Sequence, residues 1–387
     1  MSLIKVPQST LSYQTIDNTP DLTDFCQLAR SAGWFAIDSE FVRQRTYYAR
    51  LGLLQAHAEG ATVIIDPLAE IDLAPLWEII GDARIKTVLH AGGEDIELFY
   101  HQAGQQSPQS LFDTQIAAGF CGLGASLGYA KLVDQLCGGV ELDKSLSRTD
   151  WLKRPLSQEQ LDYAAADASY LSAMYPYLLE LCEQREVTQL VQAESRLQVE
   201  KRTQQVAPDL LYLFVGNAWQ LNRQQLGILR ALTAWRQRKA QQRDIPLGFI
   251  FKDGVLLELA RRQPGTERQL LAIEGLPPLT RKYSGKEIVQ VISQGQQQSE
   301  HQLPQNLQRL DDMDGYKAAV KNIKAAIQKL ADKLQVDTAL IASRKQINDF
   351  LNYYWQFTSE QQQRLAPPDL SRGWRWHYLE PELKGLV

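Results

Sequence analysis

The N-terminal half of the chain alternates between continuous apolar runs and apolar residues at helical spacing. Trp34–Phe41 has the pattern of a buried strand, and Leu51–Ala58 and Thr62–Ile65 are two further strand patterns separated by a Glu-Gly turn. Such a short turn joins neighbouring antiparallel strands. The pattern therefore predicts that these three strands form an antiparallel meander.

Helical patterns lie between and after further strand patterns. Tyr13–Ile16 and Thr87–Ala91 are short strand candidates, and a helix is predicted at Ala74–Ile80 between them. Glu159–Glu200 is a long helical pattern in which a bend is expected at Pro176, because proline removes a helical hydrogen bond. Strand, helix and strand in succession favour a mixed α/β sheet.

The C-terminal half contains only helical patterns, interrupted by polar stretches. Lys201–Pro208 and the Gln-rich Gln294–Pro304 are linker candidates. They predict three domains, at residues 1–205, 211–293 and 304–387. The last two blocks each carry an apolar helix with Trp and basic residues, which indicates two related helical modules.

The composition narrows the class of protein. Hydrophobic residues make up 44% and charged residues 22%, which excludes a disordered, collagen-like or disulfide-scaffold chain. Cys26, Cys121, Cys137 and Cys182 form no C-x-x-C pair and lie in no His-rich stretch, so we expect no zinc site. Four cysteines permit two disulfides, but such sparse cysteines favour buried free thiols.

The lengths of the apolar runs and the net charge limit how the chain could bind membranes or nucleic acid. No apolar run reaches about 18 residues, so we expect no membrane span. The first residues lack the layout of a signal peptide, and the expected location is the cytoplasm. The net charge is −4, so any binding to nucleic acid needs a local basic patch. Residues 223–262 hold nine basic and three acidic residues, which favours phosphate contact over a solvated helix face.

Two carboxylates interrupt the most apolar strand pattern. Asp38 and Glu40 are two residues apart, so on a strand they project from the same face. Adjacent buried carboxylates repel each other and lose hydration unless a cation neutralises them. Hard divalent ions such as Mg²⁺ or Mn²⁺ bind such oxygen ligands. The alternative is an edge strand with both side chains solvated, but the apolar residues on either side argue against it.

Two later segments carry further acidic candidates. Asp95 follows a strand pattern and two glycines at the start of a helix, where a carboxylate is also favoured by the helix dipole alone. Tyr163 and Asp167 are four residues apart and share one helix face. Taken separately, either segment fits an ordinary helix surface. Together with Asp38 and Glu40 they form an ordered series.

In this order, the motifs resemble the tyrosine branch of the DEDD superfamily of 3′–5′ exonucleases. The surrounding words are similar to those of the ribonuclease D family, at Asp38–Tyr48, His90–Asp95, Phe112–Gln115, Leu142–Trp151 and Tyr163–Asp167. The helical blocks resemble HRDC modules, most visibly at Leu340–Asn348. One departure is Gly93, where a serine is expected.

The resemblance implies a fold and an activity. The expected fold is a ribonuclease H-like α/β exonuclease domain, with a mixed sheet of an antiparallel meander and then parallel strands, followed by two all-α HRDC domains. The expected activity is 3′–5′ exoribonucleolytic trimming of tRNA precursors with release of 5′-mononucleotides. It would use two divalent metal ions, Mg²⁺ or Mn²⁺.

The resemblance also assigns roles to the acidic residues. Asp38, Glu40 and Asp167 would hold one ion, Asp38 would bridge to the second, and Asp95 would support the second through water. Tyr163 would orient the attacking water, because a phenol with a pKa near ~10 is a poor base at neutral pH.

Four other residues are candidates for contact with RNA, each with an alternative. Phe41 would wedge against the terminal base or belong to the core. His90 would contact the nucleotide or end its strand with its ring nitrogens hydrogen-bonded. Lys144 and Arg148 would bind phosphate or lie in a solvated loop. The HRDC resemblance independently implies nucleic-acid binding by the helical modules.

Two other functions remain open at this stage. The first is a 3′–5′ DNA exonuclease of the same superfamily, because no residue reports recognition of a 2′-hydroxyl. The second is a non-catalytic RNA-binding scaffold, which the loss of an acidic ligand would favour. All four acidic residues are present.

Overall fold

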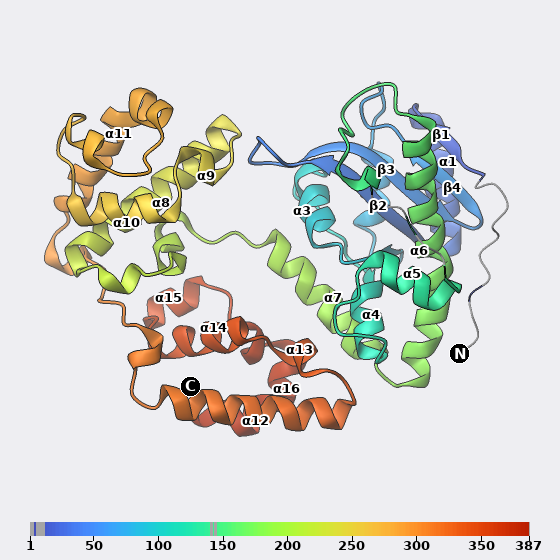
Figure 1. Ribbon diagram of the computed structural model, residues 1–387. Coiled ribbons are helices and arrows are strands. Elements are labelled where there is room, and N and C mark those ends of the chain that lie inside the picture. The colour runs from blue at the N-terminus through green and yellow to red at the C-terminus, as the bar shows by residue number, and fades with distance from the viewer. Residues whose placement is uncertain (1–3, 5–11, 140–141, 143–144, 387) are drawn as a thin grey trace.

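The computed structural model describes residues 4, 12–139, 142 and 145–386 of the 387-residue chain. Lys144, one of the predicted RNA contacts, therefore lies outside the described residues. The described chain forms an N-terminal α/β domain and two helical modules (Figure 1).

The N-terminal domain is built on one six-stranded sheet with the order β1-β4-β3-β2-β5-β6. The β2, β3 and β4 strands are antiparallel neighbours, whereas β1 runs parallel to β4, and β5 and β6 run parallel to β2. This confirms the predicted meander and the mixed sheet. The strands are β1 (Gln14–Ile16), β2 (Trp34–Val42), β3 (Arg50–Ala58), β4 (Ala61–Ile65), β5 (Lys86–Leu89) and β6 (Leu111–Asp113).

Helices cover both faces of the sheet. Phe35 and Ile37 of β2 face a core shared with α1, α2 and α3, whereas Ala36 faces a core shared with α4, α5 and α6. This alternation is the period of a strand buried on both sides. The helices of the domain are α1 (Thr19–Ala32), α2 (Ala74–Ile80), α3 (Gly93–Gln102), α4 (Thr114–Phe120), α5 (Tyr129–Cys137), η1 (Ser145–Arg148), α6 (Gln158–Gln184) and α7 (Thr188–Thr203).

The long helix predicted for residues 159–200 is two helices. Pro176 lies inside α6, and the chain breaks instead between α6 and α7, where Glu186 adopts a left-handed φ of 57°. The predicted first linker also begins too early, because α7 continues to Thr203. Similarly, the last helix of the first module continues to Gln296, inside the second predicted linker.

The first helical module has its own apolar core around α8. That helix begins with a capping box in which Asn222 and Gln225 each bond to the other's backbone N–H. The elements of this module are η2 (Pro208–Phe214), η3 (Ala218–Gln220), α8 (Arg223–Arg243), α9 (Leu247–Ile250), α10 (Asp253–Arg262), η4 (Gln269–Ala272) and α11 (Pro278–Gln296).

The second helical module shares one apolar core with α4–α7 of the N-terminal domain. Phe120 of α4 and Trp374 of α16, for example, have ring centroids 5.5 Å apart. This part of the chain comprises η5 (Glu300–Gln302), η6 (Leu310–Asp312), α12 (Tyr316–Leu334), α13 (Thr338–Ile341), α14 (Arg344–Trp355), α15 (Ser359–Arg364), η7 (Asp369–Ser371), α16 (Gly373–Leu383) and η8 (Lys384–Leu386).

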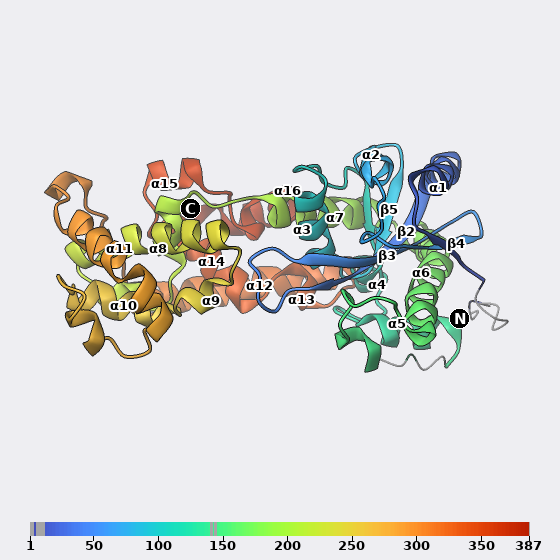
Figure 2. The ribbon, with the colours of Figure 1, turned by 90° about the horizontal axis from the view of Figure 1, so that it is seen from above.

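The molecule is elongated when seen from above (Figure 2) and broader in the view of Figure 1. The N-terminal domain lies at one end and the first module at the other, with the second module alongside α7 between them. The loop that joins β2 to β3 reaches toward the first module. No helix in the described part of the chain is long and apolar enough to cross a membrane. All four cysteines are free, as expected.

Candidate active site

Strand β2 and helix α6 bring three predicted carboxylates together. Asp38 and Glu40 project from the face of β2 that α6 covers, and Asp167 approaches from α6. One carboxylate oxygen from each of the three residues lies within 4.8 Å of the others. Glu40 and Asp167 are buried, and Asp38 is partly exposed. The structure thus places three of the four predicted acidic residues in one cluster.

Small side chains let α6 approach the sheet closely. Ala164, Ala165 and Ala168 are fully buried between the helix and its neighbours. Tyr163 therefore reaches the cluster on the same helix face as Asp167, close enough for its phenol to lower the pKa of that carboxyl group. Tyr129 of α5 donates a hydrogen bond to the backbone carbonyl of Asp167 at 2.5 Å. The helix is thus fixed at the residue that supplies the third carboxylate.

Asp95 approaches the cluster from the other side of β2. It lies in the first turn of α3 and accepts a hydrogen bond from the hydroxyl of Ser39, whose side chain alternates to the face opposite Asp38 and Glu40. Asp95 is outside the three-carboxylate group, but its charge is close enough to raise the pKa of Asp38. It lies at the edge of the cluster.

The turn before α3 is stabilised by a buried carboxylate that accepts hydrogen bonds from backbone N–H groups. Asp113 at the end of β6 accepts the backbone N–H groups of Ala91 and Gly92 at 3.0 and 3.1 Å. A Cβ atom on Gly92 would lie 2.7 Å from the side chain of Leu89, so only glycine fits this turn. These contacts place the first turn of α3, and with it Asp95, beside β2.

Burial raises the pKa of every carboxyl group in the site, and neighbouring carboxylates raise those of Asp38, Glu40 and Asp95 further. Burial and the charges of Asp95 and Asp167 raise the pKa of Asp38 well above its usual range. Burial and the neighbouring carboxylates raise the pKa of Glu40 to about 9. Burial raises the pKa of Asp167 to about 7 and that of Asp95 to about 6, with hydrogen bonds from Tyr163 and Ser39 partly opposing the shifts. The fully ionised cluster is therefore costly without a cation.

The chemistry of the donor set fits a hard divalent cation. The three clustered ligands are carboxylate oxygens, the donors that Mg²⁺ and Mn²⁺ prefer. Gln55 of β3, which pairs with Asp38 in the strand register, donates a hydrogen bond to Asp38 Oδ2 at 2.8 Å and orients that carboxylate. This oxygen-only donor set is compatible with the use of divalent metal ions.

The structure places three of the other predicted contacts. The ring nitrogens of His90 lie 2.9 Å from the Thr114 hydroxyl and 3.1 Å from the Leu127 carbonyl, which favours the alternative that this side chain fixes the strand end. Phe41 is partly buried and packs against the core beneath α1–α3. Arg148 is exposed on η1. RNA contact by Phe41 and Arg148 stays a prediction.

Sequence reasoning missed the residues that support the acidic ligands. Ser39 was not predicted as part of the site, because strand alternation places its side chain on the opposite face from Asp38 and Glu40. Gln55 depends on the register between β2 and β3, which the sequence pattern does not specify. Asp113 lies in the Phe112–Gln115 motif, but its contacts with the β5–α3 turn follow only from the fold.

The basic stretch at residues 223–262 is less positive in three dimensions than in sequence. Five of its nine basic residues form ion pairs, and two of the acidic partners, Glu287 and Glu300, lie outside the stretch. Arg238, Arg243 and Lys252 are exposed cations with no ion pair among the described residues. Trp235 is buried and stacks on Phe251, as expected of a core residue.

The fold and the acidic cluster define a DEDD-type 3′–5′ exonuclease and are compatible with the use of divalent metal ions. The family model for a 3′–5′ exonuclease matches residues 13–183. The HRDC domain model matches residues 225–292, and that for the C-terminal HRDC domain of ribonuclease D matches residues 314–383.

Whole-chain relatives narrow the class to one family. Ribonuclease D of Escherichia coli (strain K12) is 39% identical over 380 residues, covering 97% of this chain and 99% of the relative. That of Cronobacter turicensis is 40% identical over 368 residues, covering 95% and 97%. The crystal structure of Escherichia coli RNase D matches with a TM-score of 0.90 at 39% identity, covering 97% of this chain and 98% of the other. The chain belongs to the ribonuclease D family and is a 3′–5′ exoribonuclease.

Proposed function

We propose that this exoribonuclease trims the 3′ ends of tRNA precursors in the cytoplasm, with two divalent ions, Mg²⁺ or Mn²⁺, as cofactors. The observation that carries the metal chemistry is the cluster of Asp38, Glu40 and Asp167, with carboxylate oxygens within 4.8 Å of one another. The Escherichia coli relative is described as an exoribonuclease involved in structured RNA processing. A tRNA precursor with extra 3′ nucleotides is a structured RNA of this kind.

The acidic residues divide the metal binding between them. Asp38, Glu40 and Asp167 would hold one ion, and Asp38 and Asp95 would serve the second. When bound, the ions lower the pKa of a water molecule and stabilise charge on the leaving 3′-oxygen. Ser39 and Gln55 keep the carboxylates of Asp95 and Asp38 oriented, through the hydrogen bonds described above.

Tyr163 acts as a hydrogen-bond donor. Burial and the nearby carboxylate of Asp167 raise the pKa of the phenol far above its usual value. The phenol therefore keeps its proton at neutral pH and orients the attacking water; it does not act as a general base. Loss of its hydroxyl should reduce the rate less than loss of a carboxylate ligand.

The three-part organisation serves the same reaction. We divide the chain into an exonuclease domain at residues 1–205, a first HRDC module at 211–293 and a second HRDC module at 304–387, each containing one matched family model. The HRDC modules hold the body of the RNA while its 3′ tail enters the active site. A tail tethered in this way has a high effective concentration at the carboxylates.

Digestion of a 3′-extended tRNA tests the proposal. The purified enzyme should shorten the tail one nucleotide at a time and release 5′-mononucleotides, seen by product sizing. EDTA should stop the reaction, and Mg²⁺ or Mn²⁺ added in excess should restore it. Internal cleavage, or full activity in EDTA, would contradict the proposed mechanism.

A DNA oligonucleotide of matched sequence distinguishes the proposed function from the two alternatives, a DNA exonuclease and a non-catalytic scaffold. RNA and DNA oligonucleotides of the same sequence should be degraded at different rates, with RNA faster. Equal or faster degradation of DNA would favour the DNA exonuclease. Absence of cleavage in either, with RNA still bound, would favour a scaffold.

A further inference from the structure

The loop between β2 and β3, residues 43–49, contacts the first HRDC module (Figures 1 and 2). One carboxylate oxygen of Asp244 accepts the backbone N–H groups of Tyr47 and Tyr48, both at 3.0 Å. Gln237 donates a hydrogen bond to the Tyr47 phenol at 2.5 Å, and the Tyr47 ring packs against the core of the module. The tip of the loop is therefore docked on α8.

The same loop is fixed at its other side to the active site. Arg43 forms two hydrogen bonds with Glu97 of α3, at 2.7 and 3.1 Å, and Tyr48 packs edge-on against His101 of α3 at 4.7 Å. Helix α3 carries Asp95, and β2 leads into the loop directly from Glu40. The loop thus joins the first HRDC module to two elements that supply acidic ligands.

Asp244 occupies a position where its own helix does not favour an acidic side chain. It is the C-cap of α8 in the left-handed conformation, with φ 47° and ψ 52°, and glycine or asparagine is the usual residue there. The negative end of the helix dipole also opposes a carboxylate at this position. The contact with the loop, through two charge-assisted hydrogen bonds, gives this carboxylate a function that α8 alone does not.

We propose that Asp244 is a positioning residue: it fixes the first HRDC module against the β2–β3 loop, so that RNA held by the module presents its 3′ tail to the carboxylate cluster. This inference rests on the proposed function of the HRDC modules. Without the contact, the first module keeps its own core and its apolar contact with the second module around Leu210, Tyr353 and Leu365, but the loop no longer fixes it against β2. RNA held by the module then reaches the active site at a lower effective concentration.

Two substitutions at the same position separate the hydrogen bonds from the backbone conformation. Asp244→Gly removes the acceptor and keeps the left-handed conformation, which glycine adopts without strain. Asp244→Asn keeps an acceptor oxygen and also tolerates this conformation. The matched control is Gln263→Gly: Gln263 ends α10 with a φ of 50°, and its side chain bonds Gln296 within the same module.

The assay compares two RNA substrates on the full-length enzyme. One is a stem-loop RNA with a single-stranded 3′ tail, and the other is an oligonucleotide too short to contact the HRDC module. For Asp244→Gly, KM for the stem-loop RNA should rise about tenfold while kcat and cleavage of the short oligonucleotide stay unchanged. Asp244→Asn and Gln263→Gly should behave as the wild type does.

Hydrogen exchange provides a readout at the contact itself. The amides of Tyr47 and Tyr48 should exchange faster in Asp244→Gly and at the wild-type rate in Asp244→Asn. Wild-type KM in Asp244→Gly would overturn the inference, as would an equal loss on both substrates or an equal defect in Asp244→Asn. A wild-type enzyme that degrades no RNA would instead overturn the proposed function.

Discussion

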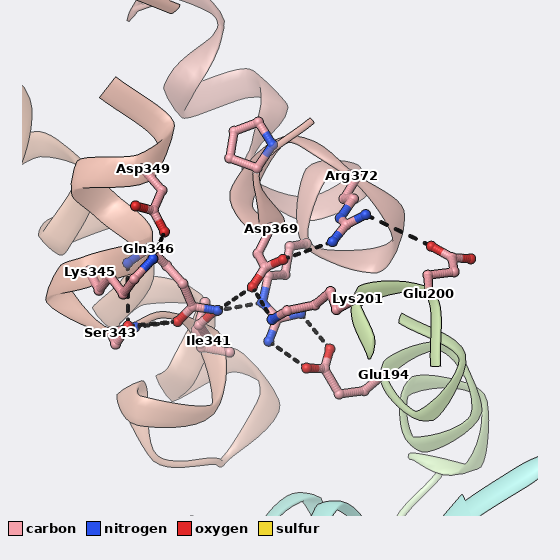
Figure 3. Close-up of polar contacts among 12 residues, drawn as sticks. Glu194, Glu200, Lys201, Ile341, Ser343, Lys345, Gln346, Asp349, Asp369 and Arg372 are labelled. Atoms are coloured by element: carbon pink, nitrogen blue, oxygen red, sulfur yellow. Dashed lines mark hydrogen bonds and ion pairs between the residues drawn. The ribbon is translucent and has the colours of Figure 1, made fainter. Parts of the chain in front are cut away.

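Two clusters of carboxylates in this molecule, each partly or fully buried, differ in what surrounds them. In the active site, burial raises the pKa of Asp38 and Glu40, and the neighbours that raise it further are other carboxylates. Between α7 and the second HRDC module, Asp369 instead accepts hydrogen bonds from Lys201 at 2.7 Å and Gln346 at 2.6 Å (Figure 3). We refer to the second group, with the nearby Glu194–Arg375 pair, as the inter-domain cluster.

The titration of the two clusters differs in direction. Burial raises the pKa of Asp369, but the hydrogen bonds and charge of Lys201, with Gln346 and Arg372, outweigh burial and lower it to about 2. Burial and repulsion raise the pKa of Glu40 to about 9. A buried carboxylate with a cationic side chain beside it is part of the fold. A buried carboxylate surrounded by its own kind needs a cation from solution.

The largest effect should come from neutralising one carboxylate of the active site. Asp38→Asn should lower kcat at least about 10³-fold, because it removes a metal ligand. The free energy of unfolding should be unchanged or higher, because a repelled charge is removed. Single-turnover kinetics and urea unfolding measure the two quantities. The control is Asp162→Asn on the exposed side of α6, which should leave kcat unchanged.

The opposite result is expected in the inter-domain cluster. Glu194 accepts hydrogen bonds from Arg375 and, at 2.9 Å, from Trp374. Glu194→Ala leaves the buried Arg375 guanidinium without its ion-pair partner and should lower the free energy of unfolding by about 3 kcal/mol. Activity should persist below the melting temperature. Glu382→Ala, which removes the half-exposed partner of the exposed Lys329, should cost less than about 1 kcal/mol.

Metal addition should stabilise the protein through the active site alone. At a concentration 100-fold above Kd, Mn²⁺ or Mg²⁺ should raise the free energy of unfolding by about 2.7 kcal/mol. Thermal unfolding of the wild type and of Asp38→Asn, with metal and with EDTA, measures the shift. A similar shift in Asp38→Asn would mean that the ions bind elsewhere.

Acid should remove the contribution of Asp369. Its folded pKa of about 2 lies below the usual 3.8, so the ionised form stabilises the fold above about pH 4, and this stability is lost as pH falls toward 2. The difference in unfolding free energy between wild type and Asp369→Asn should therefore shrink by about 1 to 2 kcal/mol over that range. Urea unfolding at several pH values measures this difference. A difference that does not change with pH would show that Asp369 has the same pKa in the folded and unfolded states.

Much of the fold follows from local patterns in the sequence. Strands β2, β3 and β4 lie within a residue or two of their predicted bounds. Each is a run of apolar residues between turn residues, and the turn residues mark where the strand begins and ends. The break between α6 and α7 was not predicted. It depends on Glu186 in a left-handed conformation, which a glycine or asparagine would have signalled.

The site was predictable only as far as residues share one element. Strand period pairs Asp38 with Glu40, and helix period pairs Tyr163 with Asp167. That these two pairs of residues lie close together was predicted only from the family resemblance, because no local pattern relates one element to another. The contact of Asp244 with Tyr48 joins residues 196 positions apart and left no trace in the sequence pattern. The basic stretch misled for the same reason, because acidic partners outside it neutralise part of its charge.

The core that the second HRDC module shares with α4–α7 has a consequence for synthesis on the ribosome. The exonuclease domain leaves the ribosome first, but residues of α4 and α7 acquire their last packing partners only when α16 has been translated. At about 5 to 20 residues per second, the intervening stretch of about 200 residues takes roughly 10 to 40 s to synthesise. During that interval the nascent domain exposes an unfinished apolar surface, which makes it a candidate client for chaperones.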